Sequence, residues 1–218
     1  MSRPSARPAI RPAEEADAPA IARLVAEALG EKYRPALGRS AERAIEALVR
    51  RDVSAPGAMR RWVAELDGRL AGVVSVAIGA DVDAGFPQTL ADAVGWPRAI
   101  RATLVLSVLA HGRLDADEAY IDELAVDGWA RRRGVASALL EACADQAHAA
   151  GRRRLTLWVT IDNAGGRALY DATGFAEARR RRWLAGRVLF RAPGAILMER
   201  RLAPARDRPT PDPARPTA

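Results

Sequence analysis

The chain has 218 residues, 49% of them apolar, which is enough for one domain with a well-filled hydrophobic core. A single cysteine excludes an internal disulfide framework and favours a reducing, cytoplasmic location. The sequence shows no apolar run of membrane-spanning length and no signal peptide, so we expect a soluble protein with no membrane partner.

The positive charge of the chain is unevenly distributed. The formal net charge is +7, yet residues 81–127 contain 3 basic and 9 acidic residues, whereas residues 128–202 contain 15 basic and 6 acidic residues. No aromatic residues interleave the arginine runs at 152–154 and 179–182, as a stacking platform for nucleic-acid bases would require. We therefore interpret these runs as solvated faces and strand edges and expect no nucleic-acid partner.

Strand and helix patterns alternate over residues 8–78. Apolar residues recur at helical spacing after Asp17, and Asp67-Gly68 between two apolar runs is a strong hairpin signal. The predicted elements are a disordered arm at 1–7, a strand at 9–11, helices at 17–30 and 40–51, and strands at 60–65 and 70–78. Tyr33 and Arg34 lie in the predicted loop between the helices, where they either contact a substrate or only cover the core.

Residues 80–118 form a predicted insertion between the third and fourth strands. Pro97 fits the first turn of a helix that extends to about His111, and this helix carries apolar residues on two sides. We predict that it packs between two surfaces, either as a core or homodimer-interface helix or as a lid over an acceptor pocket. Around the pocket mouth the insertion would place Phe86, Trp96, Asp81, Asp83, Asp115 and Asp117.

A strand, a glycine-containing turn and a helix follow one another from Tyr120 to Gly151. Residues 120–126 have strand composition, and Val135, Leu139, Ala142, Cys143, Gln146 and Ala147 share one face of the helix. The turn between them reads Arg131-Arg132-Arg133-Gly134-Val135-Ala136. Because the first turn of a helix leaves amide groups unbonded and carries positive dipole charge, this segment is suited to binding a pyrophosphate.

A second motif follows a predicted strand at 155–160. It reads Asn163-Ala164-Gly165-Gly166-Arg167-Ala168-Leu169-Tyr170-Asp171-Ala172-Thr173-Gly174-Phe175. Two final strands are predicted at 187–191 and 195–202, with Trp183 and Phe190 as packing or substrate-edge residues. Residues 203–218 are rich in proline and nearly devoid of apolar anchors, so we expect a disordered tail.

The two motifs together resemble those of the GNAT superfamily of N-acetyltransferases. Arg131, Gly134 and Ala136 match the family's first motif, and residues 163–175 match its second, except that Gly166 replaces the usual alanine. The resemblance covers residues 8–202. It implies an α/β (α+β) fold in one domain, with a mixed, mainly antiparallel twisted sheet of about six to seven strands flanked by helices and with the helical insertion at 80–118.

By the same resemblance, the chain is expected to move an acetyl group from acetyl-CoA to a primary amine of a small molecule, by direct attack in a ternary complex. No metal is expected, because His111, His148 and Cys143 cannot supply a zinc site. The resemblance implies these acetyl-CoA contacts: Leu124, Ala125, Val126, Arg131, Arg132, Arg133, Gly134, Val135, Ala136, Ser137, Asn163 and Tyr170. The implied acceptor contacts are Tyr33, Arg34, Tyr120 and Asp122.

The resemblance also assigns catalytic roles. The hydroxyl of Tyr170 is expected to act as the general acid that protonates the leaving thiolate. Strand alternation places Tyr120, Asp122, Leu124 and Val126 on one face and Ile121, Glu123 and Ala125 on the other. Asp122 is the first candidate for the general base, through water, and Glu123 is the second. Alternatively, Asp122 forms a structural ion pair with an arginine, and an acceptor of near-neutral pKa needs no strong base.

Two other functions stay open at this point. One is a non-catalytic acyl-CoA-binding module that senses the ligand or regulates a partner. The other is an acetyltransferase acting on a protein or an aminoacyl-tRNA amine, which the basic surface favours and the acidic insertion disfavours. The residues that select the acceptor lie in loops and in the insertion, where the family pattern gives no guidance.

Overall fold

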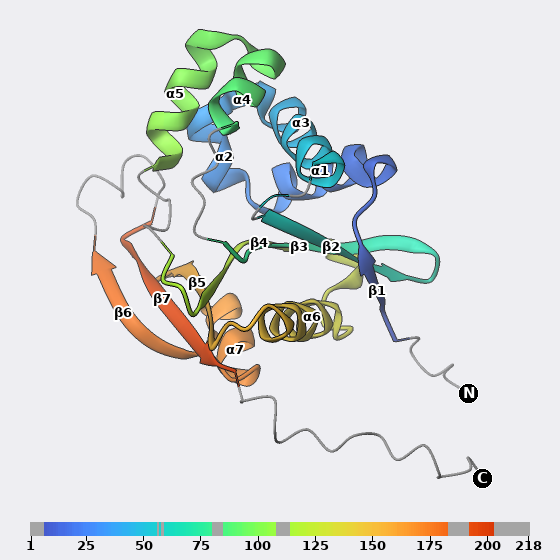
Figure 1. Ribbon diagram of the computed structural model, residues 1–218, viewed down its shortest axis with the longest axis vertical. Coiled ribbons are helices and arrows are strands. Elements are labelled where there is room, and N and C mark those ends of the chain that lie inside the picture. The colour runs from blue at the N-terminus through green and yellow to red at the C-terminus, as the bar shows by residue number, and fades with distance from the viewer. Residues whose placement is uncertain are drawn as a thin grey trace.

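The computed structural model describes residues 7–55, 57, 59–79, 85–107, 114–182 and 192–202. A seven-stranded sheet in the order β1-β2-β3-β4-β5-β7-β6 separates two groups of helices (Figure 1). The strands are β1 Ala9–Pro12, β2 Met59–Leu66, β3 Arg69–Ala77, β4 Glu118–Val126, β5 Arg154–Thr160, β6 Ala176–Arg182 and β7 Gly194–Arg201. The helices are α1 Ala18–Ala28, α2 Gly30–Leu37, α3 Ala41–Ser54, α4 Phe86–Val94, α5 Trp96–Ser107, α6 Val135–Ala149 and α7 Ala164–Ala172.

Neighbouring strands of the described sheet run antiparallel, except for the parallel pair β4 and β5. This mixed sheet agrees with the predicted fold class. Asp67 and Gly68 join β2 to β3 with φ angles of 53° and 71°, and two successive positive φ values are the geometry of a tight hairpin turn. Short 3-10 turns, Glu15–Asp17, Gly38–Ser40 and Gly128–Ala130, precede α1, α3 and the turn before α6.

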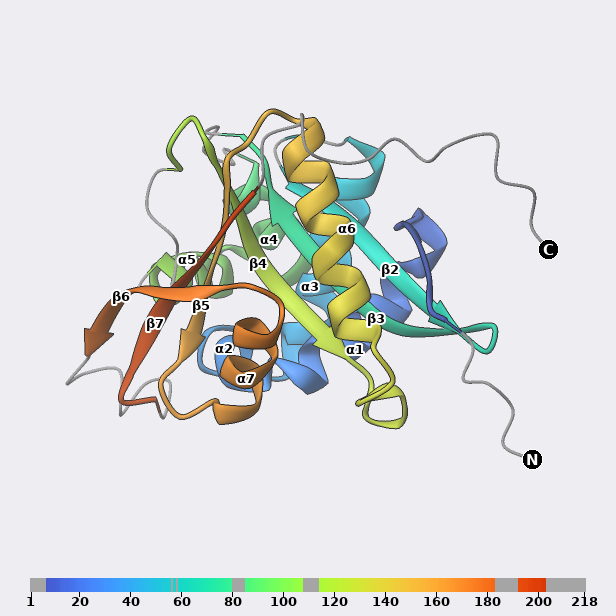
Figure 2. The same cartoon turned by 90° about the horizontal axis from the view of Figure 1, so that it is seen from below.

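Each face of the sheet has its own hydrophobic core. Helix α6 lies across one face, where Leu139, Leu140 and Cys143 are fully buried against strand side chains (Figure 2). Gly72 of β3 allows the close approach of α6, because a Cβ there would lie 2.9 Å from Val135 and 3.1 Å from Leu139. Helices α1 and α3 pack on the opposite face, beside α2, α4 and α5.

Some local predictions were wrong. The residues between the first two helices form α2 rather than a loop, although Pro35 lies inside this helix and removes a hydrogen bond. Burial of Tyr33, Ala36 and Leu37 against the core stabilises the short helix in spite of that proline, since packing outweighs propensity. Strand β6 was not predicted, because its four consecutive arginines lack a strand pattern.

The insertion contains two helices, α4 and α5, where one was predicted. Helix α5 is not enclosed on two sides: Ala99 and Ala102 are buried, whereas Ile100 is 54% and Leu104 is 65% exposed. The insertion packs on α2 and α3, and Arg101 donates a hydrogen bond to the carbonyl of Pro35 at 2.8 Å.

Helix α6 is rotated from its predicted face. Leu140 and Ala144 are buried in place of Ala142 and Gln146. Predictions for the following segments fall on residues outside the described ones: 1–6, 80–84, 108–113, 183–191 and 203–218. No described helix has the length and apolarity needed to cross a membrane.

Strand β4 is irregular in two places that matter for function. Its residues Glu118–Ile121 pair with Arg154–Leu157 of β5, and the two strands diverge beyond Ile121. On its other side, β4 has a bulge: Ser75 of β3 pairs with Glu123 and Val76 pairs with Ile121, so Asp122 has no paired residue in β3. The predicted alternation along β4 is therefore wrong: Ile121 and Leu124 both belong to the core under α6, although they are three residues apart.

Candidate active site

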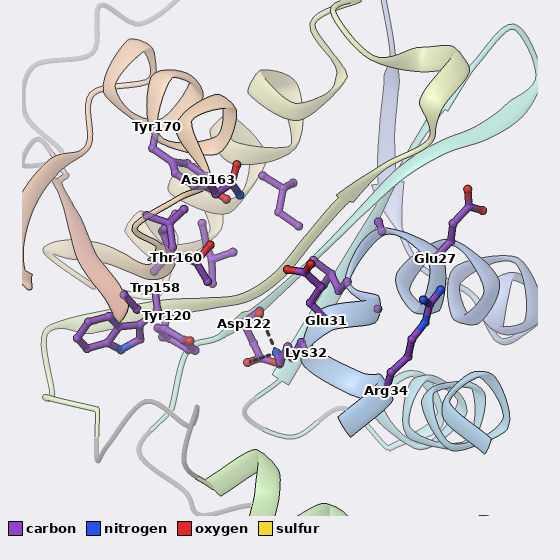
Figure 3. Close-up of a pocket in the computed structure, with 18 of the residues that line it drawn as sticks. Glu27, Glu31, Lys32, Arg34, Tyr120, Asp122, Trp158, Thr160, Asn163 and Tyr170 are labelled. Atoms are coloured by element: carbon purple, nitrogen blue, oxygen red, sulfur yellow. Dashed lines mark hydrogen bonds and ion pairs between the residues drawn. The ribbon is translucent and has the colours of Figure 1, made fainter. Parts of the chain in front are cut away.

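A pocket of about 480 Å³ opens where β4 and β5 diverge (Figure 3). The end of α1 and the first turns of α2 form one wall, the bulged part of β4 forms the floor, and β5 with α7 forms the other wall. Six of the predicted site residues line this pocket: Arg34, Tyr120, Asp122, Leu124, Asn163 and Tyr170. Figure 3 shows Tyr120 and Asp122 on β4 and Tyr170 on α7. The pocket lies where β5 leaves β4, and no strand among the described residues occupies that gap.

Tyr170 enters the pocket from α7. Its ring packs edge to face on Phe175, with 5.8 Å between the ring centroids, which fixes the direction of the hydroxyl. Burial raises the pKa of Tyr170 to about 12, so the phenol carries its proton at neutral pH. Within the described residues the hydroxyl makes no hydrogen bond, and it therefore remains available to a group bound in the pocket.

Helix α7 begins with a cap that explains Gly166. The Asn163 side chain accepts a hydrogen bond from the Gly166 amide at 2.8 Å, as an N-cap residue does. A Cβ at position 166 would lie only 2.7 Å from the Asn163 side-chain nitrogen. The departure from the family's alanine thus makes room for this cap. Asn163 also lines the pocket, as expected of a residue in contact with the donor.

Asp122 forms an ion pair with a residue that sequence reasoning missed. Lys32 Nζ lies 3.0 Å from Asp122 Oδ1 and 3.1 Å from the Asp122 carbonyl oxygen, and both side chains line the pocket (Figure 3). The alternative expected for Asp122, an ion pair with an arginine, is therefore present in a different form, because the partner is a lysine. One sequence signal could have identified Lys32, since it is the single lysine among 34 basic residues.

Glu123 lies behind the pocket in a buried network. Tyr33 donates a hydrogen bond to Glu123 Oε1, Arg61 Nη1 donates to Oε2, and the Ser75 hydroxyl lies 3.2 Å from Oε2. Burial alone would raise the pKa of Glu123, but the charges of Arg61 and Lys32 outweigh it and lower this pKa to about 2. Glu123 is therefore ionised, its carboxylate oxygens already accept hydrogen bonds from the protein, and it does not line the pocket.

Arg61 extends this network to α3. Its side chain is 6% exposed, Asp52 Oδ2 accepts a hydrogen bond from its Nε at 3.1 Å, and its Nη2 forms an ion pair with the same oxygen at 3.0 Å. Burial would lower the pKa of Arg61, but the carboxylates of Glu123 and Asp52 raise it. The network joins α2, β4, β2 and α3 through side chains that are up to 90 residues apart in the chain. It holds α2, and with it Lys32, against the bulge of β4.

The two candidates on α2 are placed differently. Tyr33 is 4% exposed and points to Glu123, outside the pocket lining, whereas Arg34 lines the pocket. Burial raises the pKa of Tyr33 well above its usual value, and the Glu123 charge adds to this shift. Burial likewise raises the pKa of Tyr120, with further contributions from Asp122 and Tyr170. Tyr120, Asp122 and Tyr170 all line the pocket.

The arginine-rich turn lies at the far end of β4 and outside the pocket lining. Gly134 caps α6 with φ 79°, and a Cβ there would meet no atom within 4 Å, so the backbone is open to a ligand. Arg132 also has a positive φ, 59°. Arg133 is partly engaged: it bonds to Asp67 at 2.9 Å and lies over the Trp129 ring, 5.8 Å from its centroid. The open turn at a helix start fits a phosphate group.

The remaining predicted donor contacts differ in accessibility. Leu124 lines the pocket, whereas Ala125 is 2% exposed in the core beside α1 and Val126 packs against the core under α6. Val135 is also buried, so only its backbone could meet a ligand. Ala136 and Ser137 are partly exposed in the first turn of α6, and Arg131 is exposed.

Comparisons with known proteins agree with this geometry. Residues 23–175 match the sequence model described as the acetyltransferase (GNAT) family. The crystal structure of an acetyltransferase is 24% identical, with a TM-score of 0.59, and the match covers 89% of this chain and 100% of that one. The ribosomal-protein-S18-alanine N-acetyltransferase from Escherichia coli is 21% identical, with a TM-score of 0.55, over 94% of this chain and 99% of that one.

A GNAT-family acetyltransferase from Streptococcus pneumoniae is 20% identical, with a TM-score of 0.57, over 90% of this chain and 100% of that one. At these identities the structural matches show a shared fold and leave the acceptor undefined. No curated protein sequence matched the chain.

Proposed function

The chain belongs to the acetyltransferase (GNAT) family, and from this premise we propose that it transfers the acetyl group of acetyl-CoA to a primary amine of a small molecule in a ternary complex. The observation that carries this proposal is the convergence of Tyr170 and Asp122 on one pocket between diverging strands. The pocket can hold an amine and a thioester side by side, and proximity alone lowers the barrier to their reaction.

The donor would be held at two places. The open turn from Arg131 to Gly134 and the first amides of α6 would bind its phosphates, with guanidinium groups at the rim. The gap between β4 and β5 would receive the extended pantetheine arm, next to Asn163 and Leu124. When bound there, acetyl-CoA supplies the activated acetyl group, and the protein supplies orientation and proton transfer.

Tyr170 is proposed to protonate the leaving thiolate. Its raised pKa keeps the phenol protonated throughout the physiological range, and it has no competing hydrogen bond within the described residues. General acid catalysis of this kind contributes about 10²–10⁴-fold to the rate. The proposed proton acceptor is Asp122, whose carboxylate is held in position by Lys32. Glu123 is assigned a positioning role, because it lies behind the pocket and already accepts three hydrogen bonds.

The pocket lining carries both charges, and the carboxylates within it would suit the ammonium group of an amine acceptor. Glu27 and Glu31 line the pocket in addition to Asp122, and both are exposed near its entrance. Carboxylates at the entrance of a cleft concentrate cations there and increase the rate at which they bind. Arg34 and Arg181 line other parts of the same pocket, so a small acceptor that carries an anionic group besides its amine would also find partners.

A second candidate function is acetylation of an amine on a protein or an aminoacyl-tRNA. All seven residues of β6 are exposed, including the arginines 179–182. Arg179 and Arg181 lie over the Trp158 ring, at 5.6 Å and 5.4 Å from its centroid, beside the pocket. An exposed row of guanidinium groups next to a reactive site suits a polyanionic partner. Loss of binding to tRNA with rising salt would support this candidate.

The proposal is tested by thermal unfolding with and without acetyl-CoA, together with thiol release on a panel of primary amines. A ligand at a hundredfold excess over its Kd stabilises the folded state by about 2.7 kcal/mol, which gives a measurable rise in Tm. Stabilisation with amine-dependent thiol release supports the enzyme. Stabilisation without release on small amines, protein amines or aminoacyl-tRNA would favour the non-catalytic acyl-CoA sensor instead, and no stabilisation would refute the assigned donor site.

A further inference from the structure

We propose that Lys32 is a self-acetylation site. This inference rests on the proposed function, because the same pocket and the same donor would carry it out. Its starting point is that Lys32 is the single lysine of the chain and that its ε-amino group lies in the acceptor pocket. Arginine cannot take its place, because a guanidinium is always protonated and delocalised and is not a nucleophile.

The environment of Lys32 matches what an acceptor amine requires. Nζ lies 3.0 Å from Asp122 Oδ1, which is the proposed proton acceptor, and 3.1 Å from the Asp122 carbonyl oxygen. Figure 3 shows the side chain of Lys32 directed to Asp122 at the floor of the pocket. The side chain of Arg34, on the same helix, is directed away from Asp122. The nitrogen of Lys32 therefore lies where β4 separates from β5, beside the gap proposed for the donor.

The side chain is held yet reachable. Lys32 is 24% exposed and Asp122 is 32% exposed, so the pair is in contact with solvent and with anything bound in the pocket. The ammonium also lies 5.3 Å from the centroid of the Tyr33 ring. Tyr33 in turn is fixed by Glu123, and Glu123 by Arg61. These contacts fix the position of α2, and therefore the backbone position from which the Lys32 side chain extends.

The chemical step balances with groups that are present. Asp122 accepts a first proton from the Lys32 ammonium and releases it to solvent, and a bond then forms between Nζ and the acetyl carbonyl carbon. As the carbon–sulfur bond of the thioester breaks, Asp122 accepts the second proton from Nζ, and Tyr170 gives its proton to the departing thiolate. Asp122 then returns its proton to the phenol through solvent. The products are Nε-acetyl-Lys32, free coenzyme A and one proton released to solvent. Acetylation removes the charge that pairs with Asp122.

The test uses the full chain incubated with acetyl-CoA in the absence of any acceptor. Trypsin cuts after Lys32 only while its amine is free, so acetylation both adds the mass of one acetyl group and joins the two peptides on either side. We expect one acetyl group per chain, located at Lys32 by fragment masses. An acetylated α-amino group at the start of the chain appears in a different peptide and is scored separately.

Two variants separate catalysed from spontaneous modification. Lys32→Arg keeps a cation beside Asp122 but offers no amine, so the mass gain should disappear. Tyr170→Phe removes the proposed acid, so acetylation of Lys32 should slow by about 100-fold or more. Acetylation at the same rate in Tyr170→Phe and in the urea-unfolded chain would overturn the inference, because it would show direct chemical acetylation by the thioester.

The failure of this inference is distinguishable from the failure of the proposed function. If acetyl-CoA raises the Tm and an added amine is acetylated while Lys32 stays unmodified, the inference is overturned and the proposed function stands. If acetyl-CoA neither raises the Tm nor modifies Lys32, both are overturned.

Discussion

The buried pair between Arg61 and Glu123 gives a quantitative prediction. Glu123→Gln removes the charge while keeping the size and the ability to hydrogen-bond, so the guanidinium of Arg61 loses one of its two carboxylate partners. The two side chains are 6% and 2% exposed, and breaking a buried pair of this kind costs about 3–5 kcal/mol. Because Arg61 keeps Asp52, we expect the lower end, about 3 kcal/mol.

The pKa of Glu123 gives the pH dependence of this stabilisation. Burial raises this pKa, but the charges of Arg61 and Lys32 outweigh burial and lower the pKa from 4.5 to about 2 on folding. A depressed carboxylate pKa stabilises the folded state above the unfolded value of 4.5, and the stabilisation is lost as the pH falls from 4.5 towards 2. Glu123→Gln should therefore be less stable than the wild type at pH 7 and should have a flatter stability curve between pH 4.5 and 2.

The assay is thermal unfolding across this pH range, with circular dichroism as the probe. For a domain of this size, about 3 kcal/mol corresponds to a decrease in Tm of about 6–12 °C at pH 7. Glu177→Gln is the matched control, because Glu177 pairs with Arg180 at 2.7 Å on the exposed strand β6 and should leave the Tm unchanged. Equal Tm values for both variants and the wild type would refute the reasoning about buried charge.

Three further predictions concern the binding turn, the helix cap and the acid. Gly134→Ala forces a side chain onto φ 79°, so we expect about 1–2 kcal/mol of destabilisation and weaker acetyl-CoA binding, measured by denaturant titration and calorimetry. Gly166→Ala should fail to raise the Tm in spite of the higher helix propensity of alanine, because its Cβ would disturb the Asn163 cap; a clear rise would refute that explanation. Because the pKa of Tyr170 is about 12, deprotonation of Tyr170 should not reduce turnover below about pH 11. A decrease in turnover below pH 11 that is present in the wild type and absent in Tyr170→Phe would contradict this.

Much of the fold was predictable because its signals are local. The hairpin at Asp67-Gly68 depends on two adjacent residues, and the turn at Gly134 followed by an amphipathic helix depends on about fifteen. Tyr170 lines the pocket, and its motif also contains Asn163, the cap residue that fixes the start of α7.

The parts that sequence reasoning missed depend on distant contacts. The bulge at Asp122 arises from the pairing of β4 with β3, and it reverses which side chains face the core without any signal in residues 120–126. The sequence makes Glu123 a candidate base, but it does not reveal the partner of Glu123, Arg61, which is 62 positions away. Lys32 meets Asp122 across 90 positions and through a helix that was expected to be a loop.

The central claim is that this pocket catalyses acetyl transfer with Tyr170 as the acid. Its most direct test is the rate of thiol release by Tyr170→Phe under saturating acetyl-CoA and an accepted amine, with Glu177→Gln on the exposed strand β6 as the control outside the pocket. We expect Tyr170→Phe to slow by about 100-fold or more while acetyl-CoA still raises its Tm, and Glu177→Gln to keep most of the wild-type rate. A Tyr170→Phe enzyme as fast as the wild type would contradict the account.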